Sequence, residues 1–190
     1  YAEHLADAGR VEELHDLITR EWMEAKLGAF GSPQPFADDL DKALRVAEAQ
    51  GWPGVPCLFA WSLARATLSS RAADIPWDAL ALMTRLGQSQ RALAYARTIE
   101  ETKRKAYSLQ SIAGALAESG ETDLALEVAG EIEYDIVKAG ALTDVARALA
   151  RGGEIERARA VAERIEERWN NHILDEIAWA VATAEEVERA

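Results

Sequence analysis

Two segments in the second half of the chain repeat each other at a fixed offset, and this repeat restricts the fold more than any other feature. Residues 109–132 read LQSIAGALAESGETDLALEVAGEI, and residues 142–165 read LTDVARALARGGEIERARAVAERI. The segments align without a gap, so that Leu109 matches Leu142 and Gly120 matches Gly153. A fixed period of this size, about 33 residues, is typical of proteins built from stacked helical repeats.

Each copy predicts two short helices around a glycine. Leu109, Ile112 and Leu116 recur at three- and four-residue spacing, which places them on one helical face. Gly120 then ends the first helix, because glycine accepts the left-handed conformation that closes a helix. Val128 and the residues at the same spacing form the face of the second helix. Neither helix can bury its face alone, so the unit must stack on a neighbour.

The pattern continues in both directions and predicts the fold and its division. We expect an all-α protein, a right-handed α-solenoid of antiparallel helical pairs with about 33 residues per repeat. Residues 1–75 form an N-terminal helical segment with a loop over residues 28–36, where two glycines and two prolines interrupt any helix. Residues 28–75 do not fit the 33-residue register, so they are either a divergent repeat or a junction between two arrays. Residues 76–190 form the regular array, truncated inside its last repeat.

Composition excludes several classes of partner. The net charge of −12 argues against nucleic acid and against an anionic membrane surface. Apolar runs stay below the roughly 18 residues that span a bilayer. The single cysteine, Cys57, suits a reducing compartment, so we expect a cytoplasmic protein.

Catalytic and cofactor motifs are missing from the sequence. It contains no GxxxxGK[ST] phosphate loop, no HExxH and no CxxC. The three histidines, His4, His15 and His172, have no accompanying metal-ligand pattern. We therefore expect no metal, no cofactor and no enzymatic activity.

The one indication of function is variation at the outward positions of the first helix of each repeat. In a solenoid of helical pairs these positions line the concave face and are free to differ while the core repeats. Large aromatics, arginines and single carboxylates are side chains that binding surfaces use. The arginines make this strip locally basic, so an acidic or peptide-like partner fits it. The candidate binding residues are Trp77, Arg85, Tyr107, Gln110, Glu118, Thr143, Arg147, Arg151, His172, Asp175 and Trp179.

Two alternatives compete with this interpretation of the strip. The variation is also what ordinary drift between solvent-facing positions produces. An acidic stretch from Glu121 to Asp135, without a basic residue, is a second surface that a basic partner would fit.

The array resembles the tetratricopeptide repeat over about residues 76–190. Gly120 and Ala125 stand where that family has its turn glycine and second-helix alanine, and Ala113 stands where it has a small first-helix residue. The chain lacks that family's large aromatics in each unit and its closing proline. This resemblance implies a protein-binding array.

A second resemblance covers nearly the whole chain. YAEHLADAGRVEELHDLI, EWMEAKLG and FADDLDKAL are similar to the helical segment that follows the ATPase and winged-helix parts of bacterial STAND signalling NTPases. Repeats of the form ALAYARTI and LQSIAGALAESG are similar to their sensor arrays. The resemblance implies a sensor or regulatory region with an attached NTPase module elsewhere in a longer chain. The alternatives are an enzyme with an active-site cleft in the solenoid and a purely architectural spacer.

Overall fold

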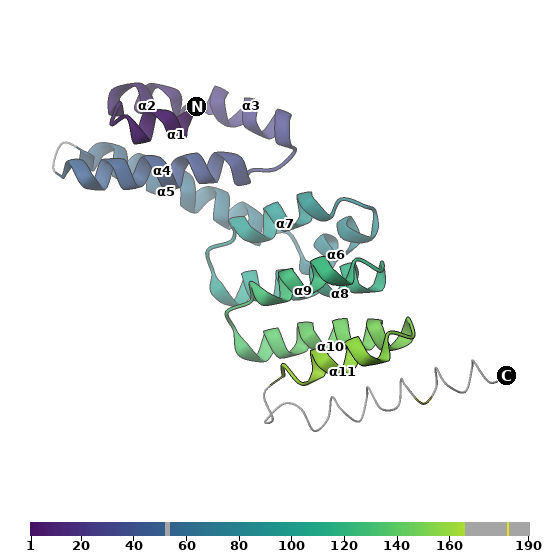
Figure 1. The fold of residues 1–190 in the computed structure, drawn as a ribbon. Coiled ribbons are helices and arrows are strands. Elements are labelled where there is room, and N and C mark those ends of the chain that lie inside the picture. Colours follow the sequence, from purple (N-terminus) through teal and green to yellow (C-terminus); the bar gives the residue numbers. More distant parts are fainter. Residues whose placement is uncertain (52–53, 166–181, 183–190) are drawn as a thin grey trace. The chain divides into compact units, whose positions relative to one another are not determined.

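The computed structural model describes residues 1–51, 54–165 and 182. Within these residues the regular structure consists of eleven α-helices and no strand, so the predicted all-α class is confirmed (Figure 1). The chain forms two compact units. Unit 1 comprises residues 1–75 and 94–100, and unit 2 comprises residues 76–93 and 101–190.

Unit 2 contains two layers of helices. In the first layer α8 (Thr102–Glu118) contacts both α6 (Trp77–Arg85) and α10 (Asp135–Arg151). In the second layer α9 (Thr122–Gly130) packs on α8 and α10, and α11 (Ile155–Ala162) packs on α10. Figure 1 shows α9 and α11 in front of α8 and α10. The helix α7 (Ser89–Thr98) begins in unit 2 and ends among the residues of unit 1.

The core of unit 2 is built from the residues that repeat in the sequence. Leu109, Ile112 and Leu116 of α8 are buried, as the helical spacing predicts. Alanines occupy many of the contacts between helices, and their small side chains let helix axes approach closely. The equivalent buried positions in the two pairs are Ala113 and Ala146, Ala125 and Ala158, Val128 and Val161, Ala129 and Ala162, and Ile132 and Ile165.

A glycine in the left-handed conformation joins the helices of each pair. Gly120 has φ +84°, and its N–H donates to the carbonyl of Ala117 at 3.1 Å. The N–H of Glu121 reaches back to the carbonyl of Leu116 at 2.9 Å. These two bonds form a Schellman motif, which satisfies carbonyls at the end of α8 and turns the chain back toward α9. The same pair of bonds is present around Gly9, Gly87 and Gly153.

We expect Gly120→Ala to destabilise the protein by about 1–2 kcal/mol, because a Cβ makes the left-handed conformation unfavourable. A Cβ built on Gly120 has no atom within 4 Å, so the cost arises from the backbone alone. Gly130 is the matched control, because it is helical and its added Cβ also meets nothing within 4 Å. Urea denaturation of both variants measures the difference, and equal midpoints would contradict the role of Gly120.

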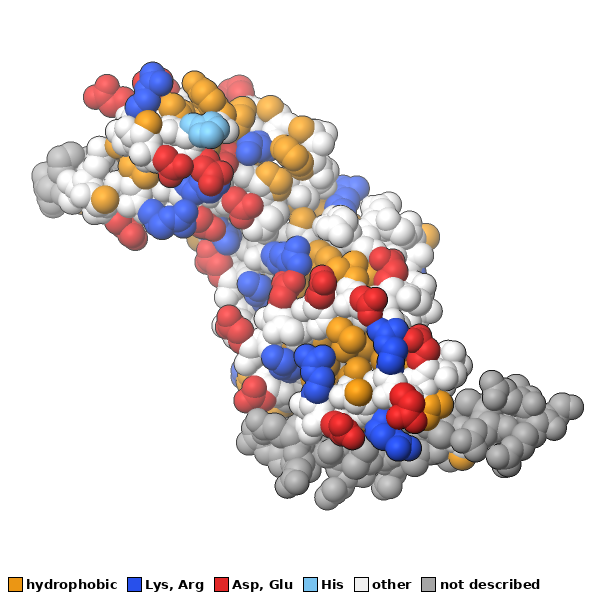
Figure 2. Space-filling model, in the orientation of Figure 1, with side chains coloured by type: hydrophobic (Ala, Val, Ile, Leu, Met, Phe, Trp, Pro, Cys, Tyr) orange, Lys and Arg blue, Asp and Glu red, His pale blue; other side chains and the backbone are white. Residues whose placement is uncertain are grey.

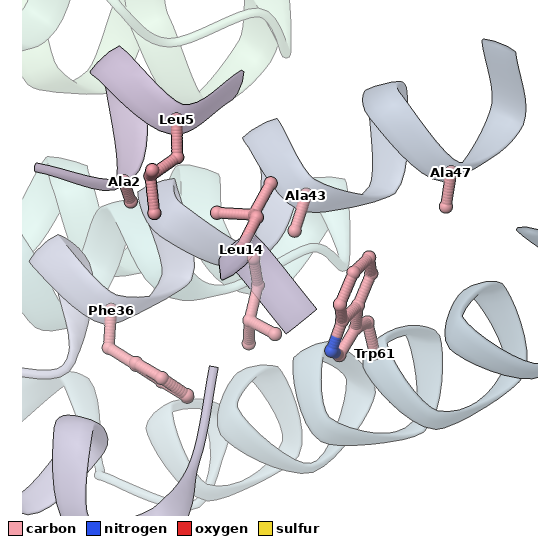
Figure 3. Packing of buried hydrophobic residues seen from close by; sticks show 8 residues of the cluster. Ala2, Leu5, Leu14, Phe36, Ala43, Ala47 and Trp61 are labelled. Carbon is pink, nitrogen blue, oxygen red and sulfur yellow. The ribbon is translucent and has the colours of Figure 1, made fainter. Parts of the chain in front are cut away.

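Unit 1 contains five helices that lie wholly within it. They are α1 (Ala2–Asp7), α2 (Val11–Leu17), α3 (Arg20–Phe30), α4 (Gln34–Gln50) and α5 (Val55–Ala73). Figure 3 shows the core cluster that α1, α2, α4 and α5 form together. Leu14 of α2 is fully buried there, with Phe36 of α4 and Trp61 of α5 in the same cluster.

The loop predicted over residues 28–36 is shorter than expected. The helix α3 continues through Gly28 to Phe30, and α4 already begins at Gln34. Gly31, with φ +66°, ends α3 by donating its N–H to the carbonyl of Leu27 at 2.8 Å. Pro35 lies in the first turn of α4, where a missing N–H costs nothing. The prolines therefore start a helix here instead of lengthening a loop.

Residues 94–100, which the repeat pattern places in the regular array, belong to unit 1. Arg65 of α5 explains this, because its Nη1 donates to the carbonyl of Thr98 at 3.1 Å while its Nε donates to Asp41 at 3.0 Å. The Ser69 hydroxyl accepts a hydrogen bond from the N–H of Glu100 at 2.8 Å. These polar contacts fix the end of α7 against α5.

One buried carboxylate helps to hold the helix α3 on unit 1. Asp39 of α4 is 4% exposed, and its Oδ2 accepts a hydrogen bond from Trp22 Nε1 at 2.9 Å and forms an ion pair with Lys26 Nζ at 2.9 Å. The Lys26 ammonium also lies 5.2 Å from the centre of the Trp22 ring. No side chain of α3 is itself buried. The position of this helix therefore depends on these polar contacts together with Trp22 and Met23, which are partly buried against the core cluster.

We expect Asp39→Asn to loosen α3, at a cost of about 1.5–3 kcal/mol, because the charged acceptor of the Trp22 hydrogen bond and the ionic partner of Lys26 are lost. Hydrogen exchange over residues 20–30 should become faster. Asp38→Asn is the control, since Asp38 is exposed and accepts a hydrogen bond from Gln34 of its own helix. Unchanged exchange in the Asp39 variant would show that α3 is held by other contacts.

Candidate functional site

One hollow in unit 2 gathers most of the binding residues that the sequence predicts. Its volume is about 510 Å³, and α6, α8 and α10 contribute its walls. We call this hollow the groove. The predicted residues that line it are Trp77, Arg85, Tyr107, Gln110, Glu118, Arg147 and Arg151.

The offset between repeats explains why these side chains meet. Arg85, Glu118 and Arg151 follow one another at a spacing of 33 residues in the sequence, and each is the last residue of its helix, on α6, α8 and α10. A second row with the same spacing consists of Ala81, Gly114 and Arg147. Because α8 lies beside both α6 and α10, equivalent positions fall into rows across the groove.

Small residues leave room in the groove. Ala81, Gly114, Ala115 and Ala148 all line it. Glycine serves a further purpose at Gly140, where a Cβ would lie only 2.6 Å from Gln110 Nε2. The missing side chain lets Gln110 of α8 lie directly against α10. Gln110 also lines the groove.

Two aromatic rings stand at one end of the groove. Trp77 is 51% exposed and Tyr107 is 43% exposed, although both are large apolar side chains. Their ring centres are 6.0 Å apart and the rings are tilted by 41°. Aromatic pairs at this separation attract each other, so the two rings form a preformed apolar platform.

Ion pairs hold two of the three arginines in the groove. Arg85 donates through Nε and Nη2 to Glu118 Oε2, at 3.1 and 2.9 Å. Arg147 donates through Nη1 to Asp144 Oδ1 at 3.2 Å. Within the described part of the chain, Arg151 forms no ion pair or side-chain hydrogen bond. Among the three arginines of the groove, Arg151 is therefore the one without an ionic partner in the described residues.

The groove is electrically balanced, which sequence reasoning missed. Asp78 and Asp144 line it beside Glu118, so three carboxylates face three arginines. Asp144 directly follows Thr143, and a shift of one helical position in the repeat alignment would have identified it. Figure 2 shows acidic and basic side chains interspersed over the face that it draws.

The structure does not place Thr143 in the groove. It is 8% exposed, and its hydroxyl donates to the carbonyl of Ala139 at 2.7 Å. Its polar group is satisfied within its own helix, so the position contributes to packing instead of binding. The predictions for His172, Asp175 and Trp179 lie outside the described residues.

Other kinds of site are not found in the part of the chain that the structure describes. No group of three or more His, Cys, Asp and Glu side chains is arranged to hold a metal ion. Among the same residues, none of the helices combines the length and the apolar character needed to cross a bilayer.

In the acidic stretch from Glu121 to Asp135, Asp123 forms an ion pair with Arg157 of α11.

Compared with protein-family models, with curated proteins and with solved structures, the chain matches none of them.

We expect Glu118→Gln to leave the free energy of unfolding within about 1 kcal/mol of the original, because the pair with Arg85 is exposed on both sides. The substitution keeps the size of the side chain and leaves the groove with one more positive than negative charge. Denaturant midpoints measure the effect. A loss well above that range would show that the pair supports the fold instead of the groove.

Proposed function

We propose that unit 2 is a recognition module that binds an extended peptide in the groove. Its helical pairs form a right-handed solenoid with about 33 residues per repeat. The helix starts support this period, since α10 begins about 33 residues after α8, and α11 begins at the same distance after α9. The groove then lies on the concave face, built by the first helix of each pair.

The observation that carries the proposal is the convergence of the exposed aromatic pair and the arginines on one hollow. Trp77 and Tyr107 offer an apolar platform that is already formed. Arg151 offers a guanidinium that can bind a carboxylate or a peptide carbonyl. Aromatics and arginine are the side chains that most often dominate binding energy at protein interfaces.

The dimensions of the groove suit a short segment of chain. Packed helix axes lie about 8–10 Å apart, so two spacings from α6 to α10 span about 16–20 Å. An extended peptide advances about 3.3 Å per residue, and about five or six residues would cross this distance. The balanced lining accepts a peptide of mixed charge, with an apolar side chain over Trp77 and a carboxylate at Arg151.

The wider role that we propose is that of a sensor region in a larger cytoplasmic STAND-type signalling NTPase. The resemblance of residues 1–18, 21–28 and 36–44 to such proteins supports this role. Reading the coding sequence on both sides of this segment tests it. A GxxxxGK[ST] motif in the same polypeptide is expected, and a complete reading frame without one would exclude the attached NTPase.

Peptide binding is tested by selecting from a random seven-residue peptide library on the intact chain and measuring the affinity of the enriched peptides. We expect Trp77→Ala combined with Arg151→Ala to weaken binding at least tenfold, because both anchors are lost. Glu118→Gln should strengthen the binding of acidic peptides, since it leaves Arg85 without its ionic partner.

The matched control is Phe59→Ala combined with Arg45→Ala, which removes an exposed aromatic and an exposed arginine from unit 1. This control should bind the selected peptides as the original chain does. Circular dichroism verifies that helix content is equal in all variants. Peptides that bind the groove variant and the control equally well would place recognition outside the groove.

A further inference from the structure

A second hollow lies in unit 1, with walls from α3 and α5. Its volume is about 380 Å³, within the range of about 300–1,000 Å³ that is usual for small-molecule sites. Met23 and Leu27 of α3 line it, together with Leu68 and Ala72 of α5 and with Pro33. We call this hollow the apolar pocket. It shares no residue with the groove, so a ligand bound there is independent of the proposed function.

Side chains of α3 that are not fully buried form one wall of the pocket. Met23 and Leu27 are four residues apart and therefore lie on one face of α3. Leu68 and Ala72 have the same spacing on α5. A hydrogen bond and an ion pair to Asp39 tie α3 to α4, and Met23 is partly buried against the core cluster. Leu27 remains 41% exposed while lining the pocket.

Apolar walls of this kind favour an apolar occupant. The apolar lining residues Met23, Leu27, Leu68, Ala72 and Pro33 offer water no strong hydrogen-bond partner. Water forms few hydrogen bonds in such a space and is therefore stabilised little there. An apolar molecule, in contrast, forms dispersion contacts with the walls and loses its hydration shell on binding. The body of a ligand for this pocket is thus aliphatic or aromatic.

The rim of the pocket indicates the head group of the ligand. Arg71, Asp74 and Tyr95 are the polar residues that line it. Arg71 and Asp74 carry opposite charges, so an ionic head group of either sign would meet a like charge as well as an opposite one. A hydroxyl avoids this conflict, because it can accept a hydrogen bond from a guanidinium and donate one to a carboxylate.

We propose that the apolar pocket binds a small uncharged amphiphile, with an aliphatic chain against Met23, Leu27 and Leu68 and a hydroxyl at the rim of Arg71 and Asp74. The pocket then gives this protein a small-molecule site separate from the groove. Its ligand class is that of a medium-chain alcohol.

Isothermal titration of the intact chain with 1-octanol tests the proposal, and we expect saturable binding of one molecule per chain. Leu27→Trp fills the pocket from α3 and should weaken binding at least tenfold. Leu63→Trp is the matched control, because Leu63 is an exposed leucine of α5 that does not line the pocket. It should bind 1-octanol as the original chain does. If Leu27→Trp loses helix content, Met23→Trp is used in its place. Met23 lies one helical turn before Leu27 on α3 and lines the same pocket.

Octanoate and octylamine test the head group, and each should bind at least several-fold more weakly than 1-octanol. Tighter binding of either ion would overturn the assignment of an uncharged head. Failure of 1-octanol to saturate, or equal affinity in the filled variant and the Leu63 control, would overturn the site itself.

Discussion

The left-handed glycine turn is the constraint on which unit 2 depends. At Gly120 and Gly153 the chain reverses with two backbone hydrogen bonds that satisfy the carbonyls of the preceding helix. Because each reversal has the same geometry and the same distance in sequence from the next, successive pairs place equivalent faces next to each other. The buried alanines on those faces let the helices approach closely. A regular array results from one local conformation and one short list of small side chains.

The groove is a consequence of that regularity. Positions that are not needed for packing recur at the same place on α6, α8 and α10, so any side chains placed there form rows. The row of Arg85, Glu118 and Arg151 alternates in charge, and its exposed ion pair contributes little to stability. Such residues are free to serve recognition, because replacing them leaves the core unchanged. Electrostatic complementarity of this kind contributes more to specificity than to affinity.

Unit 1 is stabilised in a different way. Its core is a cluster of apolar side chains from four helices, but α3 is attached through the buried carboxylate of Asp39. The apolar pocket lies beside this helix, with walls from α3 and α5. The groove and the apolar pocket thus differ in chemistry, because the charges of the groove are balanced and most of the side chains that line the pocket are apolar.

Much of the fold and part of the candidate site were determined by the sequence alone. Helical spacing at Leu109, Ile112 and Leu116, and a glycine at position 120, are local signals, because the hydrogen bonds of a helix and its terminus join residues close in sequence. The repeat pattern also predicted Trp77, Arg85 and Tyr107 as outward-facing positions, and the structure brings these residues together at the groove.

Only the tertiary structure decided which charges meet and which positions are buried. Thr143 is buried although Gln110, which stands 33 residues earlier, lines the groove, and the next residue, Asp144, lines it instead. The ion pair between Arg85 and Glu118 joins two helices, and so does the hydrogen bond from Arg65 to Thr98. Such contacts depend on how helices pack against each other, and side-chain packing in three dimensions is not encoded in the local pattern of any one helix.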